Sequence, residues 1–346
     1  MKHVPAPAAG CRRRFLLPAL LLPLFAGCAG GPPLKSFPAL ESSGIPQEIE
    51  GVPFYPQEAL QCGPAALATV LGWSGKNVSP SQLEPRLYLP ERRGTLQVEL
   101  KAQARHYGRI PYEIPPDPSA LVEEIVAGHP VLVLQNNGLG WAPAWHYAVV
   151  VGMNPADETV RLRSGEREDY DLEYGTFLRT WARSEYWGVV ALPPDRMPAS
   201  LRGAPVLSAI TNFARVGDSD AVRQALSSAV AKWPEDVGLR FALANHWYSE
   251  GEFENAETEY RRILSFAPDA VMARNNLAWL LAEQGRTDEA HEMLPDDPER
   301  TAQELPQDPW AKSLADTAAF VRCREAGGSV ENCEAVPRPV EGARNE

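Results

Sequence analysis

The fold of the first half of the chain is decided by residues 57–67, which read QEALQCGPAAL. A single cysteine, Cys62, stands directly before Gly63 and Pro64, and small apolar residues follow. Proline suits the first position of a helix, and glycine lets the backbone approach other groups closely. The pattern therefore predicts a helix from Ala65 whose positive end points at the sulfur of Cys62.

A histidine leads an apolar strand far downstream, in residues 145–152, which read WHYAVVVG. A cysteine thiol has a pKa of about 8.5, and a helix N-terminus and an imidazolium both lower that pKa. Cys62 and His146 are therefore predicted to form a thiolate–imidazolium pair, with His146 as general base or as the standing charged partner. The alternatives are an unreactive buried thiol and a histidine of the core.

The composition describes a globular protein of 346 residues, with 44% hydrophobic and 23% charged residues, which is long enough for two domains. Its formal net charge of -12 argues against a nucleic acid or an anionic membrane surface as partner. The sequence has no phosphate-binding glycine loop, and His106 and His129 lack metal-ligand spacing to any partner. We therefore expect neither a cofactor nor a metal site.

The N-terminus has the features of an export signal. Three arginines at 12–14 precede an apolar segment at 15–25, which is too short to span a bilayer. The segment ends in LFAGC at residues 24–28, which resembles the lipobox of bacterial lipoproteins. The resemblance implies cleavage before Cys28 and lipid attachment to its thiol. Because Ala29 and not aspartate follows, it also implies anchoring in the outer membrane, facing the periplasm. An ordinary secretory signal with an incidental cysteine is the alternative.

The chain has five cysteines, and their positions predict different fates. Cys11 would leave with the signal segment, and Cys28 would carry the lipid. Cys323 and Cys333 flank a glycine-rich segment and could close a small loop as a disulfide in an oxidising periplasm. Cys62 would then remain unpaired. An unpaired thiol in an exported protein is either deeply buried or retained for its reactivity.

Breaks in composition divide the chain into segments. We expect a signal peptide at 1–27, a flexible tether at 28–48, a first domain at 49–195, a second domain at 206–325 and a C-terminal tail at 326–346. In the first domain, helices are predicted at 65–71, from 80 onward, at 95–107 and at 119–127, and strands at 131–134, 146–151, 159–163 and 187–192. Helices first and antiparallel-looking strands second indicate an α+β domain.

The second domain is repetitive. Gly217, Gly251 and Gly285 are 34 residues apart, and alanine and proline positions keep the same interval. This period resembles the tetratricopeptide repeat. The resemblance implies stacked helix pairs whose concave face holds a polypeptide substrate or partner. A helix near 308–323 is expected to cap the stack. An unrelated helical bundle is the alternative.

Residues 57–67, the distance to His146 and the run IVAGHPVLV at 125–133 together resemble the C39-like, papain-type cysteine peptidases. The similarity covers roughly residues 46–193. It implies that Cys62 is the nucleophile and His146 the base. It also implies that Gln57, with the backbone N–H of Cys62, binds the oxyanion. The chain is therefore expected to have a papain-like α+β domain followed by an all-α tetratricopeptide-repeat domain.

The residue expected to orient His146 departs from the family pattern. Where the family usually has an aspartate that orients the histidine, this chain has Ser164, which could accept a hydrogen bond but carries no charge. Asn154 or Asp157 could substitute only if their loop folds back.

The favoured function is a cysteine peptidase whose repeats recruit its substrate or a partner. The alternative is a silent papain-like binding module or a repeat scaffold in an envelope complex. Trp141, Trp145 and Tyr147 are expected to be core and rim aromatics, and a dedicated substrate clamp is the alternative. The loop at 136–140 could lie beside the cleft or be a plain connection.

Overall fold

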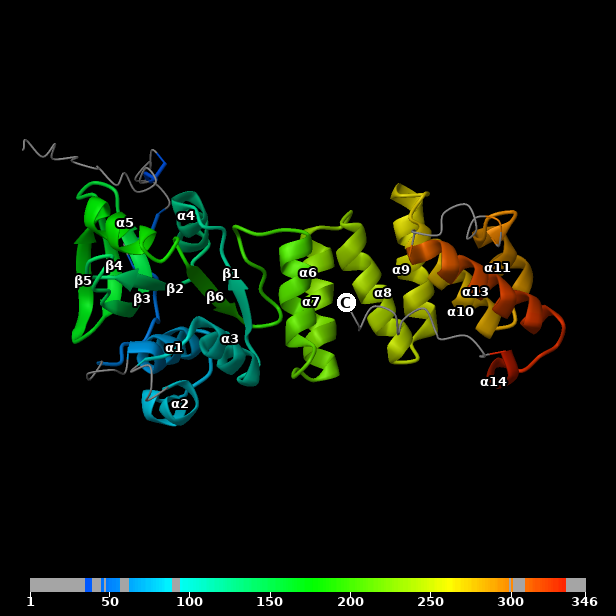
Figure 1. The fold of residues 1–346 in the computed structure, drawn as a ribbon, viewed down its shortest axis with the longest axis horizontal. Coiled ribbons are helices and arrows are strands. Elements are labelled where there is room, and N and C mark those ends of the chain that lie inside the picture. Colours follow the sequence, from blue (N-terminus) through cyan, green and yellow to red (C-terminus); the bar gives the residue numbers. More distant parts are fainter. Residues whose placement is uncertain are drawn as a thin grey trace, which may run out of the picture. The chain divides into compact units, whose positions relative to one another are not determined.

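A computed structural model describes residues 35–38, 45–46, 48–56, 62–88, 94–298, 300 and 309–333. The predicted signal segment, Cys28, most of the tether and Gln57 lie outside these described residues. An α+β domain comes first in the chain, and a helical region follows it (Figure 1). This order confirms the predicted fold class.

The α+β domain begins with three helices, and its strands follow with two further helices between them. Its elements are α1 (Cys62–Trp73), α2 (Pro80–Leu87), α3 (Gln97–His106), β1 (Ile110–Glu113), α4 (Pro118–Val126), β2 (Val131–Asn136), β3 (Trp145–Asn154), β4 (Thr159–Ser164), β5 (Arg167–Glu173), α5 (Tyr174–Ala182) and β6 (Gly188–Leu192). The four predicted strands and four predicted helices are all present. Sequence analysis missed β1, β5 and α5. β5 reads REDYDLE and lies mostly exposed, so it lacks the apolar alternation by which strands are recognised.

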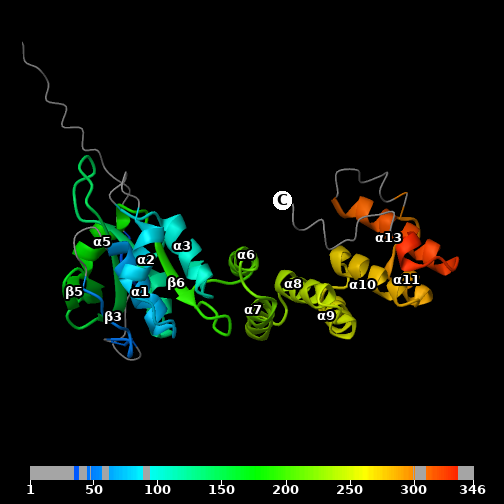
Figure 2. The ribbon, with the colours of Figure 1, turned by 90° about the horizontal axis from the view of Figure 1, so that it is seen from below.

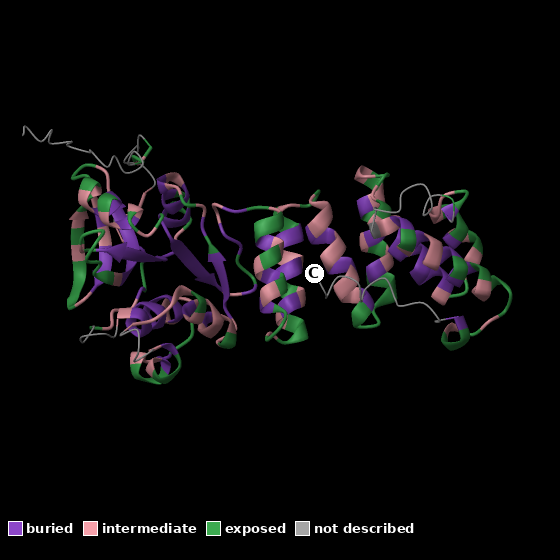
Figure 3. Ribbon diagram, viewed as in Figure 1, coloured by how far each residue is buried: buried purple, intermediate pink, exposed green. Residues whose placement is uncertain are grey.

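The strands form one antiparallel sheet in the order β1-β6-β2-β3-β4-β5. β2 and β6 are buried along their whole length, as Figure 3 shows. Helices α1, α2 and α3 lie on one face of the sheet and α5 on the other (Figures 1 and 2). Side-chain contacts agree with this arrangement, since Gln135 of β2 donates to Thr180 of α5, and Tyr147 of β3 donates to the Thr95 carbonyl just before α3.

The helical region packs as pairs. Its helices are α6 (Ala204–Phe213), α7 (Ser219–Lys232), α8 (Val237–Ser249), α9 (Phe253–Phe266), α10 (Val271–Glu283), α11 (Thr287–Met293), α13 (Pro309–Glu325) and α14 (Val330–Cys333). Ala256 and Ala290 are fully buried, as expected where small residues let two helices approach. None of the helices in the described part of the chain is both long and apolar enough to span a membrane.

Glycine is needed at the three positions that mark the 34-residue period for two different physical reasons. Gly251 and Gly285 follow α8 and α10 with φ of 79° and 78°, a left-handed conformation that side chains disfavour. Gly217 has no such φ. A Cβ there would lie 2.8 Å from the ring of Phe213, so close packing excludes a side chain.

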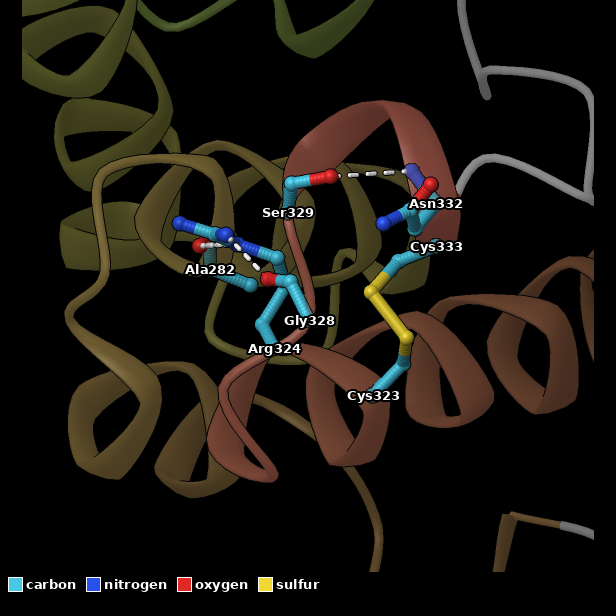
Figure 4. The surroundings of a disulfide bond; sticks show 7 residues. All are labelled: Ala282, Cys323, Arg324, Gly328, Ser329, Asn332 and Cys333. Atoms are coloured by element: carbon cyan, nitrogen blue, oxygen red, sulfur yellow. Dashed lines mark hydrogen bonds between the residues drawn. A yellow bond between two sulfur atoms is a disulfide. The ribbon is translucent and has the colours of Figure 1, made fainter.

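The C-terminal part of the helical region contains a disulfide between Cys323 of α13 and Cys333 of α14, with an S–S distance of 2.02 Å (Figure 4). The sequence predicts this pair. Arg324 donates hydrogen bonds to the carbonyl oxygens of Ala282 and Gly328, so α13 is also tied to α10. The packed helical region therefore extends to Cys333, beyond the end of the second domain that was predicted at residue 325.

Candidate active site

Cys62 is the first residue of α1, so the N-terminal end of this helix lies at the thiol. The side chain is half-buried and forms no disulfide. Gly63 is required next to it, because a Cβ at that position would lie 2.5 Å from Oγ1 and 2.6 Å from Cβ of Thr95. The helix can therefore begin against Thr95 only if the residue after the cysteine lacks a side chain.

The surroundings of the sulfur have opposing effects on its pKa. Burial raises the pKa of Cys62, while the backbone N–H groups of Tyr147, Gly63 and Cys62 itself point at the sulfur and lower it. Burial is the larger effect, so the pKa is raised overall. This result corrects the sequence-based prediction of a lowered thiol pKa. The helix N-terminus is present, but desolvation of the thiolate outweighs it.

His146 lies near the start of β3, opposite Gln135 of β2. Its Nε2 is 2.8 Å from Oγ of Ser164, the last residue of β4. Burial lowers the pKa of His146. Burial therefore disfavours the imidazolium of His146, as it disfavours the thiolate of Cys62, and opposes the predicted thiolate–imidazolium pair.

Strand geometry brings these groups together. The β3–β4 register starts at Val149↔Arg163, so β4 ends beside the first residues of β3. The sulfur of Cys62 meets the backbone N–H of Tyr147 at this end of the sheet, and Ser164 meets His146 there. Among the described residues, no hydrogen bond joins the thiol directly to the imidazole. The structure therefore brings the thiol of α1 and the imidazole of β3 to the same end of the sheet without a hydrogen bond between them.

The other residues considered for the orienting role lie elsewhere. Asn154 is the last residue of β3, at the opposite end from His146, and its amide donates to Asp157 at 2.7 Å. The structure therefore brings only Ser164 to the imidazole, among the three residues considered for this position. Gln57 lies outside the described residues, and its expected place at the oxyanion stays a prediction.

Thr95 is a residue of the site that sequence analysis missed. Its Oγ1 is buried without a hydrogen-bond partner in the described part of the chain. Its carbonyl oxygen accepts from the Tyr147 hydroxyl at 3.1 Å, so Thr95 joins the start of α1 to β3. Nothing in the local sequence distinguishes this threonine, because its role depends on two segments far away along the chain.

The described residues contain no group of three His, Cys, Asp or Glu side chains that could hold a metal ion. His129 instead hydrogen-bonds to Glu124, with 2.7 Å between Nδ1 and the carboxylate. Its role is therefore structural.

Comparison with known proteins places these features in two families. Residues 49–187 match the Peptidase_C39 like family, and residues 207–270 match the tetratricopeptide repeat. Among solved structures, a double glycine motif protease from an AMS/PCAT transporter, in complex with the leader peptide, is 21% identical with a TM-score of 0.34. The match covers 43% of this chain and 96% of that one. A putative C39-like peptidase from Bacillus anthracis is 17% identical with a TM-score of 0.35, covering 42% and 96%. No curated protein matches the chain.

Proposed function

We propose that this chain, in which a C39-like peptidase domain precedes tetratricopeptide repeats, is a cysteine peptidase that cleaves a peptide or protein through Cys62 and His146. One observation carries the proposal. The sulfur of Cys62 lies at a helix N-terminus against the backbone N–H of Tyr147, and the preceding residue is a histidine whose Nε2 bonds to Ser164.

The raised thiol pKa and the lowered imidazole pKa favour general-base catalysis over a standing ion pair. With its proton on Nε2, His146 donates to Ser164 and leaves Nδ1 free as the acceptor. Nδ1 takes the thiol proton as the sulfur attacks the peptide carbonyl. It then gives that proton to the leaving amine. Water hydrolyses the resulting thioester, and the backbone N–H of Cys62 is suited to bind the oxyanion.

A second candidate function is peptide binding without catalysis. It is favoured by the neutral orienting residue, Ser164, because a serine cannot stabilise an imidazolium as a carboxylate does. It is also favoured by the burial that holds both Cys62 and His146 uncharged.

One experiment separates these functions. The full-length protein is incubated with a peptide library, and products are identified by mass spectrometry. A peptide vinyl sulfone is used in parallel as a covalent trap for the nucleophile. We expect cleavage and trapping by the wild type and none by Cys62→Ala, with a loss of about 10²- to 10⁴-fold for His146→Ala. Turnover by a folded Cys62→Ala protein would exclude Cys62 as nucleophile. Peptide binding without products from the wild type would support the binding module.

We also propose that the repeats recruit a protein substrate or partner, and that Cys28 anchors the protein by a lipid in the bacterial envelope. The match of 207–270 to tetratricopeptide repeats supports the first part, because such repeats form extended binding surfaces. The lipobox-like residues 24–28 support the second. Recovery of the same partners by the full chain with and without Cys62→Ala would test recruitment independently of catalysis.

A further inference from the structure

An exposed apolar hairpin stands next to the candidate active site. We call residues 136–145, which connect β2 to β3, the Trp141 hairpin. Trp141 is 85% exposed, Leu139 54% and Trp145 52%. Single exposed apolar residues are common, but three large ones on one short hairpin form a patch of the kind that marks interaction sites.

The backbone of the Trp141 hairpin is held in place. Leu139 and Ala142 exchange two backbone hydrogen bonds of 3.0 and 3.1 Å. The Asn136 side chain accepts from the N–H groups of Gly138 and Ala144, both at 2.9 Å. Close packing also fixes Gly138, since a Cβ there would lie 2.3 Å from the Ala142 carbonyl oxygen. The exposed side chains are therefore presented by an ordered turn.

The turn is also attached to the body of the domain. Arg183, which follows α5, donates to the carbonyl oxygens of Asn136 at 2.9 Å and Gly138 at 2.8 Å. An apolar surface that is already ordered loses little conformational entropy when it binds a partner.

The base of the hairpin lies at the end of β3 that meets the thiol. Trp145 is the first residue of β3 and lies two residues before Tyr147. The backbone N–H of Tyr147 points at the sulfur of Cys62, and its hydroxyl bonds to Thr95. Trp145 also directly precedes His146. The hairpin therefore adjoins the end of β3 at which the sulfur of Cys62 lies.

We propose that the Trp141 hairpin binds apolar side chains of the peptide substrate beside the bond that Cys62 attacks. This inference rests on the proposed peptidase function and adds the substrate class. A peptide fits the surface better than a bilayer, because residues 136–145 contain no charged residue. Surfaces that bind anionic lipid combine apolar side chains with lysine or arginine.

The test measures binding separately from cleavage. Full-length Cys62→Ala protein is titrated with a dye-labelled Gly/Ser peptide that carries adjacent Leu and Phe residues, and with its all-Ser counterpart. We expect the Leu/Phe peptide to bind more tightly. Trp141→Ala should weaken that binding by about tenfold, which corresponds to about 1.4 kcal/mol. Val126→Ala is the matched control, because Val126 is 50% exposed on α4, away from the hairpin, and should change nothing.

Equal binding of the two peptides, or no effect of Trp141→Ala, would overturn the inference. So would Trp141-dependent sedimentation with phosphatidylglycerol vesicles in place of peptide binding. Cleavage by the wild-type protein without any dependence on Trp141 would leave the peptidase intact and remove only the hairpin's role. Trp141-dependent peptide binding without cleavage would support apolar recognition and contradict the peptidase.

Discussion

Burial holds the two candidate catalytic side chains in their uncharged forms. It raises the pKa of Cys62 and lowers that of His146, so the protein disfavours both thiolate and imidazolium. The residue beside His146, Ser164, adds a hydrogen bond but no charge. The charge of the orienting residue is therefore the variable that decides whether this site is a neutral pair or an ion pair.

Ser164→Asp is expected to move the site toward the ion pair. A carboxylate beside Nε2 raises the pKa of His146, and the imidazolium then lowers that of Cys62. In the wild type, alkylation of Cys62 by iodoacetamide should rise only above the ordinary cysteine pKa of about 8.5. In Ser164→Asp, the rise should begin at lower pH. The measurement is the rate of Cys62 labelling across a pH series.

Ser164→Asn is the matched control for this prediction, because asparagine has nearly the size of aspartate and no charge. Its labelling profile should stay close to that of the wild type. A lower onset of labelling in both variants would show that side-chain size, and not charge, controls the thiol.

At the level of the elements, helix α4 carries a carboxylate that organises two segments. Glu124 is fully buried, accepts from His129, and accepts from the backbone N–H and hydroxyl of Ser200 and the N–H of Ala199. Burial by itself raises its pKa, but these hydrogen bonds outweigh it and leave the pKa lowered. Glu124 therefore joins α4 to the segment that follows β6.

Glu124→Gln is expected to lower the free energy of unfolding by about 2 kcal/mol at neutral pH, because hydrogen bonds to a buried charged group are lost. Since the folded-state pKa is lowered, the contribution of Glu124 is complete above the ordinary Glu pKa of about 4.3 and is lost as pH falls through the folded value. The difference in free energy of unfolding between the wild type and Glu124→Gln should therefore become smaller at acidic pH. Urea unfolding at several pH values measures this difference.

The exposed neighbour Glu123 supplies the control for this prediction. Glu123→Gln makes the same chemical change on the same helix and should leave stability within about 0.5 kcal/mol of the wild type. An equal decrease in the free energy of unfolding in Glu123→Gln and Glu124→Gln would contradict the role given to Glu124.

The disulfide between α13 and α14 is expected to stabilise the end of the helical region. It closes a loop with a sequence separation of 10, for which constraint of the unfolded chain predicts about 3 kcal/mol. The double variant Cys323→Ser with Cys333→Ser should have a free energy of unfolding that is lower by this amount. Urea unfolding measures the difference.

Gly328→Ala tests the same disulfide from inside the loop. A Cβ at this glycine would lie 2.5 Å from the sulfur of Cys333 and 2.9 Å from that of Cys323. It would also lie 2.9 Å from the carbonyl oxygen of Cys323, so the substitution should destabilise both the oxidised protein and the double serine variant, and the oxidised protein more. An equal effect in both backgrounds would assign the cost to the turn and not to the sulfurs.

At the level of the whole molecule, the proposed lipid attachment would fix the C39-like domain to a membrane. Cys28→Ser is expected to move the full-length protein from the membrane fraction to the soluble fraction, because the thiol that carries the lipid is lost. Cys62→Ser is the control, because it removes a thiol that is not predicted to carry the lipid. This variant should stay in the membrane fraction. The check is immunoblotting of fractionated cells, and an unchanged distribution of the Cys28 variant would contradict the anchor.

The sequence alone determined what depends on local patterns. The helix predicted from Ala65, the strand that begins near His146 and the 34-residue repeat all follow from residues close together along the chain, although the structure starts that helix at Cys62. The expectation that Ser164 meets the imidazole came from its place relative to the family's pattern, and the structure puts it there.

Only the tertiary structure decided the electrostatics of the site. The N–H of Tyr147 reaches the sulfur because α1 packs against β3, and Thr95 meets Gly63 because separate segments converge. The direction of each pKa shift depends on how much protein surrounds the group, which no local pattern contains. Burial, strand register and contacts between distant segments exist only once the chain is folded. For that reason the sequence proposed Cys62 and His146 as a pair, but it could not supply the direction in which burial shifts their pKa values.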